Sequence, residues 1–326
     1  MNRLITAYRQ SQAIGVAVAL QLPERLAAGP RTTADLAAEC GAHEPSLQRL
    51  LRALEAMEVL EENKQVGFRL TSLGEQLRDD LLGPAARLFN SPLYWKAWLN
   101  LEHSVRTGER AFDVTFGMRD WDYYATHPED GARFDAAMAA NTGPVSKAVV
   151  AAHDFSQYTL VADIGGGDGT LLGMVLRKHP HLRGMLFDRQ DVIERARNRL
   201  REMGVTDRVD FVGGSFFESV PPGADAYVMK SIVHDWDDAS AGTILARCRS
   251  AASPGTRLLL VERVLPQKPD PGNLEPFLMD LNMLVNTGGQ ERTEAEYQAL
   301  LDRAGWRLER VVETHAGQYV LESVAG

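Results

Sequence analysis

The stretch VADIGGGDGT (residues 161–170) decides the fold. An apolar run reaches Asp163, and four of the next six residues are glycines, among them Gly165 and Gly167. Glycines at a turn from a strand into a helix let the backbone approach a ligand and expose amide N–H groups at the helix start. The dinucleotide fingerprint G-x-G-x-x-G would need a further glycine at position 170, which is Thr170. The loop therefore favours a nucleoside that carries an amino acid over a pyrophosphate.

From about residue 158 onward, short apolar segments alternate with helical segments. The expected strands are TLVADI (159–164), RGMLFD (183–188), VDFVGG (209–214), ADAYVM (224–229) and RLLLVE (257–262). Repeated strand–helix units predict an α/β fold with a Rossmann-like, mostly parallel sheet, and ligands bind such sheets at the carboxyl ends of the strands. Asp188 ends the second of these strands, where a carboxylate can accept hydrogen bonds from both hydroxyls of a ribose.

The first half of the chain has a helical pattern instead. Residues 32–63 carry a capping threonine and apolar residues at three- and four-residue steps, and residues 66–77 predict a short hairpin followed by a helix. This order is that of a winged helix. We therefore expect a mainly helical, winged-helix-like domain over residues 1–150 and a second domain that contains the parallel sheet over residues 151–326.

The composition and net charge limit the classes of binding partner that the protein can have. The 326 residues are 44% apolar and 24% charged, with a formal net charge of -9, which disfavours nucleic acid or an anionic membrane as the main partner. Cys40 and Cys248 stand in no metal-ligand spacing, so we expect no metal and a reducing, cytoplasmic location. The apolar run at 13–22 is too short to span a membrane and is interrupted at Pro23, so a core helix is favoured over a signal peptide.

A histidine surrounded by acids follows the fourth predicted strand in the stretch KSIVHDWDD (230–238). One interpretation is structural, with Asp235, Asp237 and Asp238 as capping acids at a helix start. The other is catalytic, because His234 stands at the carboxyl end of its strand and Glu262 ends the next one.

Taken together, these motifs resemble the S-adenosylmethionine-dependent small-molecule O-methyltransferases, the group that holds plant caffeate and isoflavone enzymes and bacterial antibiotic-tailoring relatives. The similar segments are ADIGGGDGTLL, FD at 187–188, MKSIVHDWDD, LLLVERVLP, NTGGQERTEAEYQALLDRAGW and the stretch at 106–138. The resemblance covers nearly the whole chain.

The resemblance implies that His234 is the general base and that Glu262 and Glu291 flank it, with Asp235 next in the motif. The chemistry suits these residue types. A phenol with a pKa of about 10 is scarcely ionised at neutral pH, so its oxygen needs a group that takes the proton as the new bond forms. A carboxylate on the other ring nitrogen fixes the tautomer and stabilises the imidazolium. No metal is required.

The resemblance also implies S-adenosyl-L-methionine as the cofactor. The residues expected to bind it are Asp163, Gly165, Gly167, Asp188, Ser215, Phe216, Lys230 and Thr142. The glycine loop would contact the methionine part, Asp188 the ribose and Lys230 the adenine region, with Thr142 as a carboxylate contact. One position departs from the family, which usually has an acid where this chain has Ser215. We expect Phe216 to cover the adenine ring and Ser215 to weaken adenine recognition without loss of binding.

For the acceptor, the resemblance implies an aromatic hydroxylated small molecule. Phe134 and Met138 match the family's pocket-lining pair, and further expected lining residues are Met283, Asn286 and Trp121. Aromatic and methionine side chains suit a flat apolar acceptor. The helical N-terminal half resembles the family's dimer-forming and substrate-lining domain, and this resemblance implies a homodimer, with residues 151–326 as the catalytic domain.

Two alternatives remain open at this stage. Some relatives implied by the resemblance bind the same cofactor without transferring its methyl, in hydroxylation or pericyclic reactions, and N- or C-methylation would use the same site. A DNA-binding regulator built on the winged helix is disfavoured, because Arg49 and Arg52 of the would-be recognition helix are balanced by three glutamates, Glu44, Glu55 and Glu58.

Overall fold

The computed structural model describes residues 1–326 and divides into two compact units. Unit 1 comprises residues 1–99 and 121–141, and unit 2 comprises residues 100–120 and 142–326. Helix α11 (Pro128–Ala152) contributes to both. The expected domain boundary after residue 150 falls at the end of this helix and stays a prediction.

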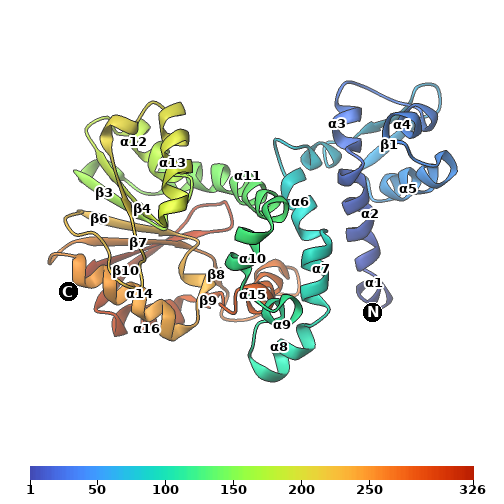
Figure 1. Ribbon diagram of the computed structural model, residues 1–326. Coiled ribbons are helices and arrows are strands. Elements are labelled where there is room, and N and C mark those ends of the chain that lie inside the picture. The colour runs from blue at the N-terminus through green and yellow to red at the C-terminus, as the bar shows by residue number, and fades with distance from the viewer. The chain divides into compact units, whose positions relative to one another are not determined.

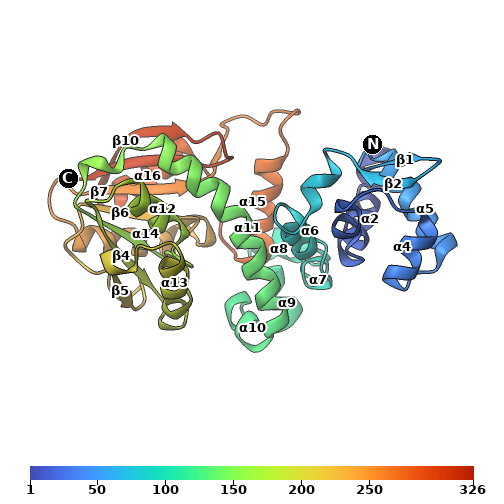
Figure 2. The same ribbon diagram turned by 90° about the horizontal axis from the view of Figure 1, so that it is seen from above.

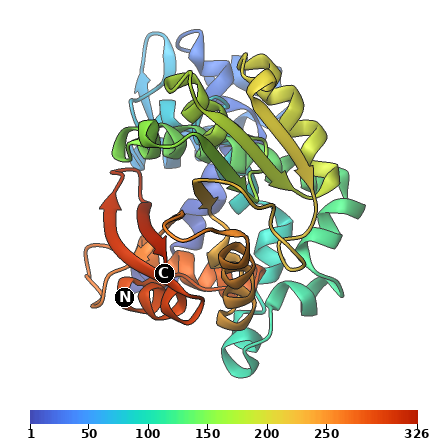
Figure 3. The same ribbon diagram turned by 90° about the vertical axis from the view of Figure 1, so that its left-hand side faces the viewer.

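Unit 2 is built on a seven-stranded sheet in the order β10-β11-β7-β6-β3-β4-β5 (Figures 1 and 3). The strands are β3 (Leu160–Ile164), β4 (Arg183–Asp188), β5 (Val209–Gly213), β6 (Ala226–Lys230), β7 (Arg257–Glu262), β10 (Trp306–Glu313) and β11 (Tyr319–Ala325). The pairs from β7 to β5 are parallel, whereas β11 pairs antiparallel with both β7 and β10. The expected α/β fold with a mostly parallel sheet is confirmed.

Helices cover both faces of this sheet, as Figures 1 and 2 show. One buried core joins the end of α11 with α12 (Thr170–Lys178) and α13 (Gln190–Glu202), and the other joins α14 (Asp238–Ala251) with α16 (Glu294–Arg303). Neighbouring strand residues belong to opposite cores, as Val161 and Ala162 of β3 do. A strand buried on both faces has a continuous apolar run, which is the pattern that predicted these strands.

The C-terminal strands were not among the predicted elements. Five predicted segments correspond to β3, β4, β5, β6 and β7, whereas β10 and β11 form an antiparallel edge, drawn in red in Figure 3. Alternation of strands with helices predicts only the parallel part of a sheet, and an antiparallel edge strand on such a sheet carries no separate signal.

Unit 1 is mainly helical, and its only sheet is a two-stranded hairpin. Its helices are α1 (Asn2–Ile5), α2 (Tyr8–Ala19), α3 (Leu22–Ala27), α4 (Thr33–Cys40), α5 (Glu44–Ala56), α6 (Gly83–Phe89), α7 (Pro92–Trp98) and most of α10 (Asp120–Thr126), and its hairpin is β1 (Leu60–Asn63) with β2 (Gly67–Leu70). The predicted threonine cap is Thr32, whose hydroxyl accepts a hydrogen bond from the Asp35 N–H in a capping box. The order α4, α5, hairpin is that of a winged helix.

Unit 2 has further helices and a short strand pair beside the seven-stranded sheet. They are α8 (Leu101–Thr107), α9 (Ala111–Phe116), α15 (Glu275–Asn286) and the short parallel pair β8 (Val264–Leu265) with β9 (Arg292–Thr293). The apolar run at 13–22 lies mostly in α2, where Ala17 and Val18 are buried. None of the helices is both long and apolar enough to cross a membrane.

Candidate active site

The glycine loop connects β3 to α12 and bends through the left-handed region of backbone space. Gly165 has φ +69° and Gly167 has φ +59°, values that glycine adopts without strain. A Cβ on Gly165 would lie 2.5 Å from the Ile232 side chain, so this glycine also permits close packing. A Cβ on Gly167 would meet no atom within 4 Å, so its backbone is open to a ligand.

Two aspartates at strand ends surround this loop. Asp188 at the end of β4 accepts hydrogen bonds from the N–H groups of Gly167 at 2.8 Å and Arg189 at 2.7 Å, one on each carboxylate oxygen. Its pKa is raised, chiefly by burial. Asp163 in β3 is buried, and burial raises its pKa to about 7 while Lys230 opposes the shift. Its Oδ2 has no hydrogen-bond partner.

Further expected cofactor residues lie at neighbouring strand ends. Lys230 ends β6 and donates to the Thr142 hydroxyl at 3.4 Å, and burial lowers its pKa while Asp163 opposes that shift. Phe216 packs edge-on against Trp236, with ring centroids 6.1 Å apart, and a Cβ on Gly165 would lie 3.7 Å from it. The Ser215 hydroxyl accepts a hydrogen bond from the Phe217 N–H at 3.3 Å. The assignment of these residues to a cofactor stays a prediction.

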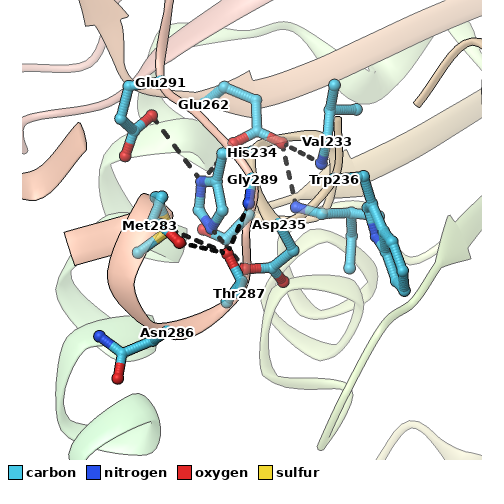
Figure 4. Close-up of polar contacts among 12 residues, drawn as sticks. Val233, His234, Asp235, Trp236, Glu262, Met283, Asn286, Thr287, Gly289 and Glu291 are labelled. Atoms are coloured by element: carbon cyan, nitrogen blue, oxygen red, sulfur yellow. Dashed lines mark hydrogen bonds and ion pairs between the residues drawn. The ribbon is translucent and has the colours of Figure 1, made fainter. Parts of the chain in front are cut away.

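His234 lies in a short 3-10 turn, η4 (Val233–Asp235), directly beyond β6. Its Nδ1 is 2.8 Å from Oε2 of Glu262, whose side chain is fully buried, and 3.9 Å from Oε2 of Glu291 (Figure 4). This contact is an ion pair when the imidazole ring is protonated. The other Glu262 oxygen accepts the N–H groups of Ile232 at 3.0 Å and Val233 at 2.7 Å.

The topology explains why these three side chains meet. Strands β6 and β7 are parallel neighbours, so Glu262 at the end of β7 lies beside the turn that follows β6. Directly after β7, the pairing of β8 with β9 brings Val264 opposite Arg292, and with it the preceding Glu291. The sequence predicted the first of these relations from strand ends, whereas the second depends on a two-residue pairing.

The electrostatics of the group centre on the imidazole. Burial lowers the pKa of His234, but the negative charges of Glu262, Asp235 and Glu291 outweigh burial and raise the pKa to about 10. Burial raises the pKa of Glu291 to about 7, with His234 opposing the shift. A protonated ring is therefore the favoured partner of these carboxylates.

The three aspartates behind His234 have different surroundings. Asp235 has an oxygen 3.6 Å from His234 Nε2, and burial together with Asp120 raises its pKa to about 7 against the pull of His234. Asp237 is the N-cap of α14 and accepts the Ser240 N–H at 2.7 Å. Asp238 pairs with two arginines. The capping interpretation thus holds for Asp237, while Asp235 faces the histidine.

The expected acceptor residues fall in different parts of the chain. Met283 and Asn286 are buried on α15, and the Asn286 amide donates to the carbonyl and side-chain oxygens of Asn282 at 3.0 and 2.9 Å. In Figure 4 the Asn286 side chain points away from His234. In unit 1, the Trp121 and Phe134 rings pack edge-on with centroids 5.5 Å apart.

Met138 is half-buried on α11, one helical turn beyond Phe134. The assignment of these side chains to an acceptor pocket stays a prediction.

Sequence reasoning missed one residue at this site. Arg292 is almost completely buried and contacts the backbone on both sides of His234. Arginine is ordinarily exposed, so its residue type gave no reason to expect burial. The only signal was the position of Arg292 next to Glu291 in the NTGGQERT motif.

Comparison with known proteins identifies the family of the chain. Residues 98–307 match the O-methyltransferase domain family, and residues 2–79 match the O-methyltransferase dimerisation domain. Phenazine O-methyltransferase PhzM of Lysobacter antibioticus is 40% identical over 327 residues, which is 98% of this chain and 94% of the relative. The structure of the mitomycin 7-O-methyltransferase MmcR has a TM-score of 0.92 and 38% identity, covering 100% of this chain and 96% of that one.

A third solved structure includes ligands. The O-methyltransferase NcsB1 from neocarzinostatin biosynthesis, in complex with S-adenosylmethionine and 2-hydroxy-5-methyl naphthoic acid, has a TM-score of 0.84 and 34% identity, covering 100% of this chain and 99% of that one. Two other relatives are named for different reactions. An 8-amino-8-demethylriboflavin N,N-dimethyltransferase of Streptomyces davaonensis is 37% identical over 89% of this chain and 84% of the relative. Aclacinomycin 10-hydroxylase RdmB of Streptomyces purpurascens is 33% identical over 91% of this chain and 81% of the relative. With both family domains matched, the chain belongs to the S-adenosylmethionine-dependent O-methyltransferases and uses S-adenosylmethionine as its cofactor.

Proposed function

We propose that this enzyme methylates a hydroxyl group of an aromatic or polyketide-like small molecule, with His234 as the general base and Glu262 and Glu291 orienting it. The observation that carries this proposal is the 2.8 Å contact between His234 Nδ1 and the fully buried Glu262 carboxylate. A buried carboxylate on one ring nitrogen fixes the tautomer and leaves the other nitrogen for an acceptor proton.

The residues around the glycine loop fit the cofactor. The open backbone at Gly167 allows a ligand to approach, and each Asp188 oxygen accepts only one backbone N–H, which leaves lone pairs for two ribose hydroxyls. Lys230 and Thr142 present a buried ammonium and a hydroxyl to a carboxylate or adenine. When bound, S-adenosylmethionine supplies a methyl group already activated by its sulfonium.

The protein's own task is then to hold the acceptor oxygen and move its proton. A phenolic oxygen becomes a good nucleophile only as it loses its proton, and general-base assistance typically contributes about 10²- to 10⁴-fold. His234 Nε2 accepts that proton, and the resulting imidazolium is stabilised by Glu262, Asp235 and Glu291. The raised pKa of His234 makes the ring a strong proton acceptor in its neutral form.

The same carboxylates impose a cost on the resting enzyme. A pKa of about 10 keeps most His234 rings protonated at neutral pH, and a protonated ring cannot act as a base. Turnover therefore begins from the neutral ring or from an ionised acceptor that binds beside the imidazolium. Both routes end with the proton on His234 and the methyl group on the acceptor oxygen.

An aromatic acceptor and a homodimer complete the proposal. Relatives named for phenazine and naphthoate substrates support an aromatic acceptor, and Trp121, Phe134, Met138 and Met283 are side chains suited to a flat ring. The match of residues 2–79 to a dimerisation domain supports a homodimer.

The alternative is a different reaction with the same cofactor, because one relative is named an N,N-dimethyltransferase and another a hydroxylase. The presence of His234, Glu262 and Glu291 together favours O-methyl transfer, since proton removal is the step that a hydroxyl acceptor requires.

The proposal is tested by incubation with methyl-labelled S-adenosylmethionine and a panel of aryl and polyketide phenols, read by mass spectrometry. We expect one labelled methyl on oxygen and release of S-adenosylhomocysteine. His234→Ala should lower kcat by about 10²- to 10⁴-fold and leave the Kd of S-adenosylhomocysteine unchanged. Undiminished turnover by this variant would show that His234 is not the base.

A further inference from the structure

The backbone that carries His234 is held by a buried arginine. Arg292 is 1% exposed, its Nη1 donates to the Val233 carbonyl at 3.1 Å, and its Nη2 donates to the Trp236 carbonyl at 2.9 Å. These carbonyls lie one residue before and two residues after His234. A single guanidinium thus bridges the turn that contains the base.

The neighbouring peptides contact the same turn. The Gln290 N–H donates to the His234 carbonyl at 2.9 Å, and Gly289 lies so close that an added Cβ would be 2.0 Å from that oxygen (Figure 4). Residues 289–292 therefore hold three carbonyl groups of the turn. Glu262 accepts two further N–H groups at the start of the same turn, those of Ile232 and Val233.

The buried charge of Arg292 is compensated within this arrangement. Its Nε donates to Asp238 Oδ1 at 3.0 Å, and its Nη1 also reaches the Gln290 carbonyl at 3.3 Å. A buried cation is costly unless its donors are satisfied, and here each guanidinium nitrogen has an acceptor. Lysine offers a point charge in place of a planar fork and cannot reach the two separated carbonyls at once.

We propose that Arg292, together with the Gly289–Gln290 peptide, is a positioning device that holds the His234 turn so that the ring meets Glu262. It acts through the backbone and does not touch the reacting atoms. The inference rests on the proposed role of His234 as base. A displacement of about 1 Å in a catalytic group can cost about 10²-fold in rate, so a residue remote from the chemistry can matter greatly.

The test compares Arg292→Lys with the natural enzyme in the presence of S-adenosylmethionine and a phenol that the natural enzyme methylates. We expect kcat to fall about 10- to 100-fold, with the acceptor KM and the Kd of S-adenosylhomocysteine changed less than about twofold. The pH profile of kcat/KM should also move to lower pH, because a displaced ring loses part of the field of Glu262, Asp235 and Glu291. A residue that only supports the fold would lower the melting temperature without moving this profile.

Arg303→Lys is the matched control. Arg303 pairs with the other oxygen of Asp238 at 3.1 Å, but its side chain is 63% exposed and donates no hydrogen bond to a carbonyl of the His234 turn. The kcat and pH profile of this variant should therefore stay unchanged. Gly289→Ala is a second probe that retains Arg292 and pushes the His234 carbonyl, and it should reproduce the loss of kcat even where Arg292→Lys does not fold.

The outcomes separate this inference from the proposed function. If His234→Ala abolishes turnover while Arg292→Lys and Gly289→Ala keep the natural kcat and pH profile, the positioning role is wrong and the base assignment stands. If His234→Ala keeps full turnover, the base assignment itself fails.

Discussion

At the scale of single residues, the charge of Glu262 controls the protonation of His234. Because the base acts only when the ring is neutral and its pKa is raised to about 10, kcat/KM should increase about tenfold per pH unit from neutrality and level off well above the ordinary histidine value of 6.5. In Glu262→Gln, the amide oxygen can still accept the two backbone N–H groups, but the charge is gone. We expect the inflection to move to lower pH and the plateau to fall about 10- to 100-fold.

The measurement is the pH dependence of kcat/KM with a single phenol of fixed pKa, so that ionisation of the acceptor contributes equally to both enzymes. Glu291→Gln is the comparison variant, because its carboxylate is 3.9 Å from His234 Nδ1 and should move the inflection less. An inflection that Glu262→Gln leaves where the natural enzyme has it would mean that this carboxylate does not set the pKa of the base.

The positions of the site residues differ in how well they could be predicted from the sequence. His234 and Glu262 end neighbouring parallel strands, and such ends meet at one edge of a sheet, so their proximity could be predicted from the strand pattern. Glu291 came only from the family resemblance. Arg292 could not be predicted, because its partners are backbone carbonyls whose positions exist only once η4, β8 and β9 have formed.

At the scale of elements, the parallel strands were predictable and the antiparallel edge was not. The alternation of apolar strands and helices indicates each crossover unit from β3 to β7. Strands β10 and β11 follow the last helix as a hairpin, and nothing local in their residues says that β11 inserts between β10 and β7. The position of β11 in the sheet is set by its pairing with β7, which lies far away in the sequence.

Strand β11 is tied by a carboxylate to His153, the residue that follows α11. Glu322 lies 2.7 Å from His153 Nδ1 and pairs with Arg310 at 2.8 Å. Burial opposes its ionisation, but His153 and Arg310 outweigh burial and lower its pKa to about 2. A lowered carboxyl pKa stabilises the folded state above the unfolded value near 4.5, and this contribution is lost as the pH falls towards 2.

Glu322→Gln should therefore reduce the free energy of unfolding by about 1 to 3 kcal/mol at pH 7, mostly through the loss of the buried His153 contact, because Arg310 is exposed. The deficit should shrink as the pH is lowered from 4.5 towards 2. Urea unfolding across this range is the measurement, and Glu313→Gln, an exposed carboxylate on β10, is the control. A deficit independent of pH would contradict an ionic contribution.

At the scale of the whole molecule, composition and charge excluded more classes of binding partner than the fold did. A net charge of -9 already disfavoured a nucleic-acid role for the winged-helix order in unit 1, and residues 2–79 match a dimerisation domain. The expected boundary after residue 150 could not be refined from sequence, because α11 is one continuous helix that contributes to both units.

The N-terminal helices carry apolar side chains that the single chain leaves exposed. Leu4 is 68% and Ile5 is 67% exposed, both within the segment that matches the dimerisation domain. Exposed apolar side chains that cluster in such a segment are typical of an interface between protein chains. A homodimer that buried Leu4 and Ile5 would remove this apolar surface of α1 from water.

We therefore expect the natural enzyme to sediment at twice the 36.0 kDa chain mass and the double variant Leu4→Glu with Ile5→Glu to raise the dimer dissociation constant by about 30-fold or more. Leu99→Glu is the control, because Leu99 is 79% exposed but lies outside residues 2–79 and should leave the dimer intact. Sedimentation velocity over a concentration series measures both. If the double variant dimerises as tightly as the natural chain, α1 takes no part in the interface, and if the natural chain is a monomer, the dimer proposal fails as a whole.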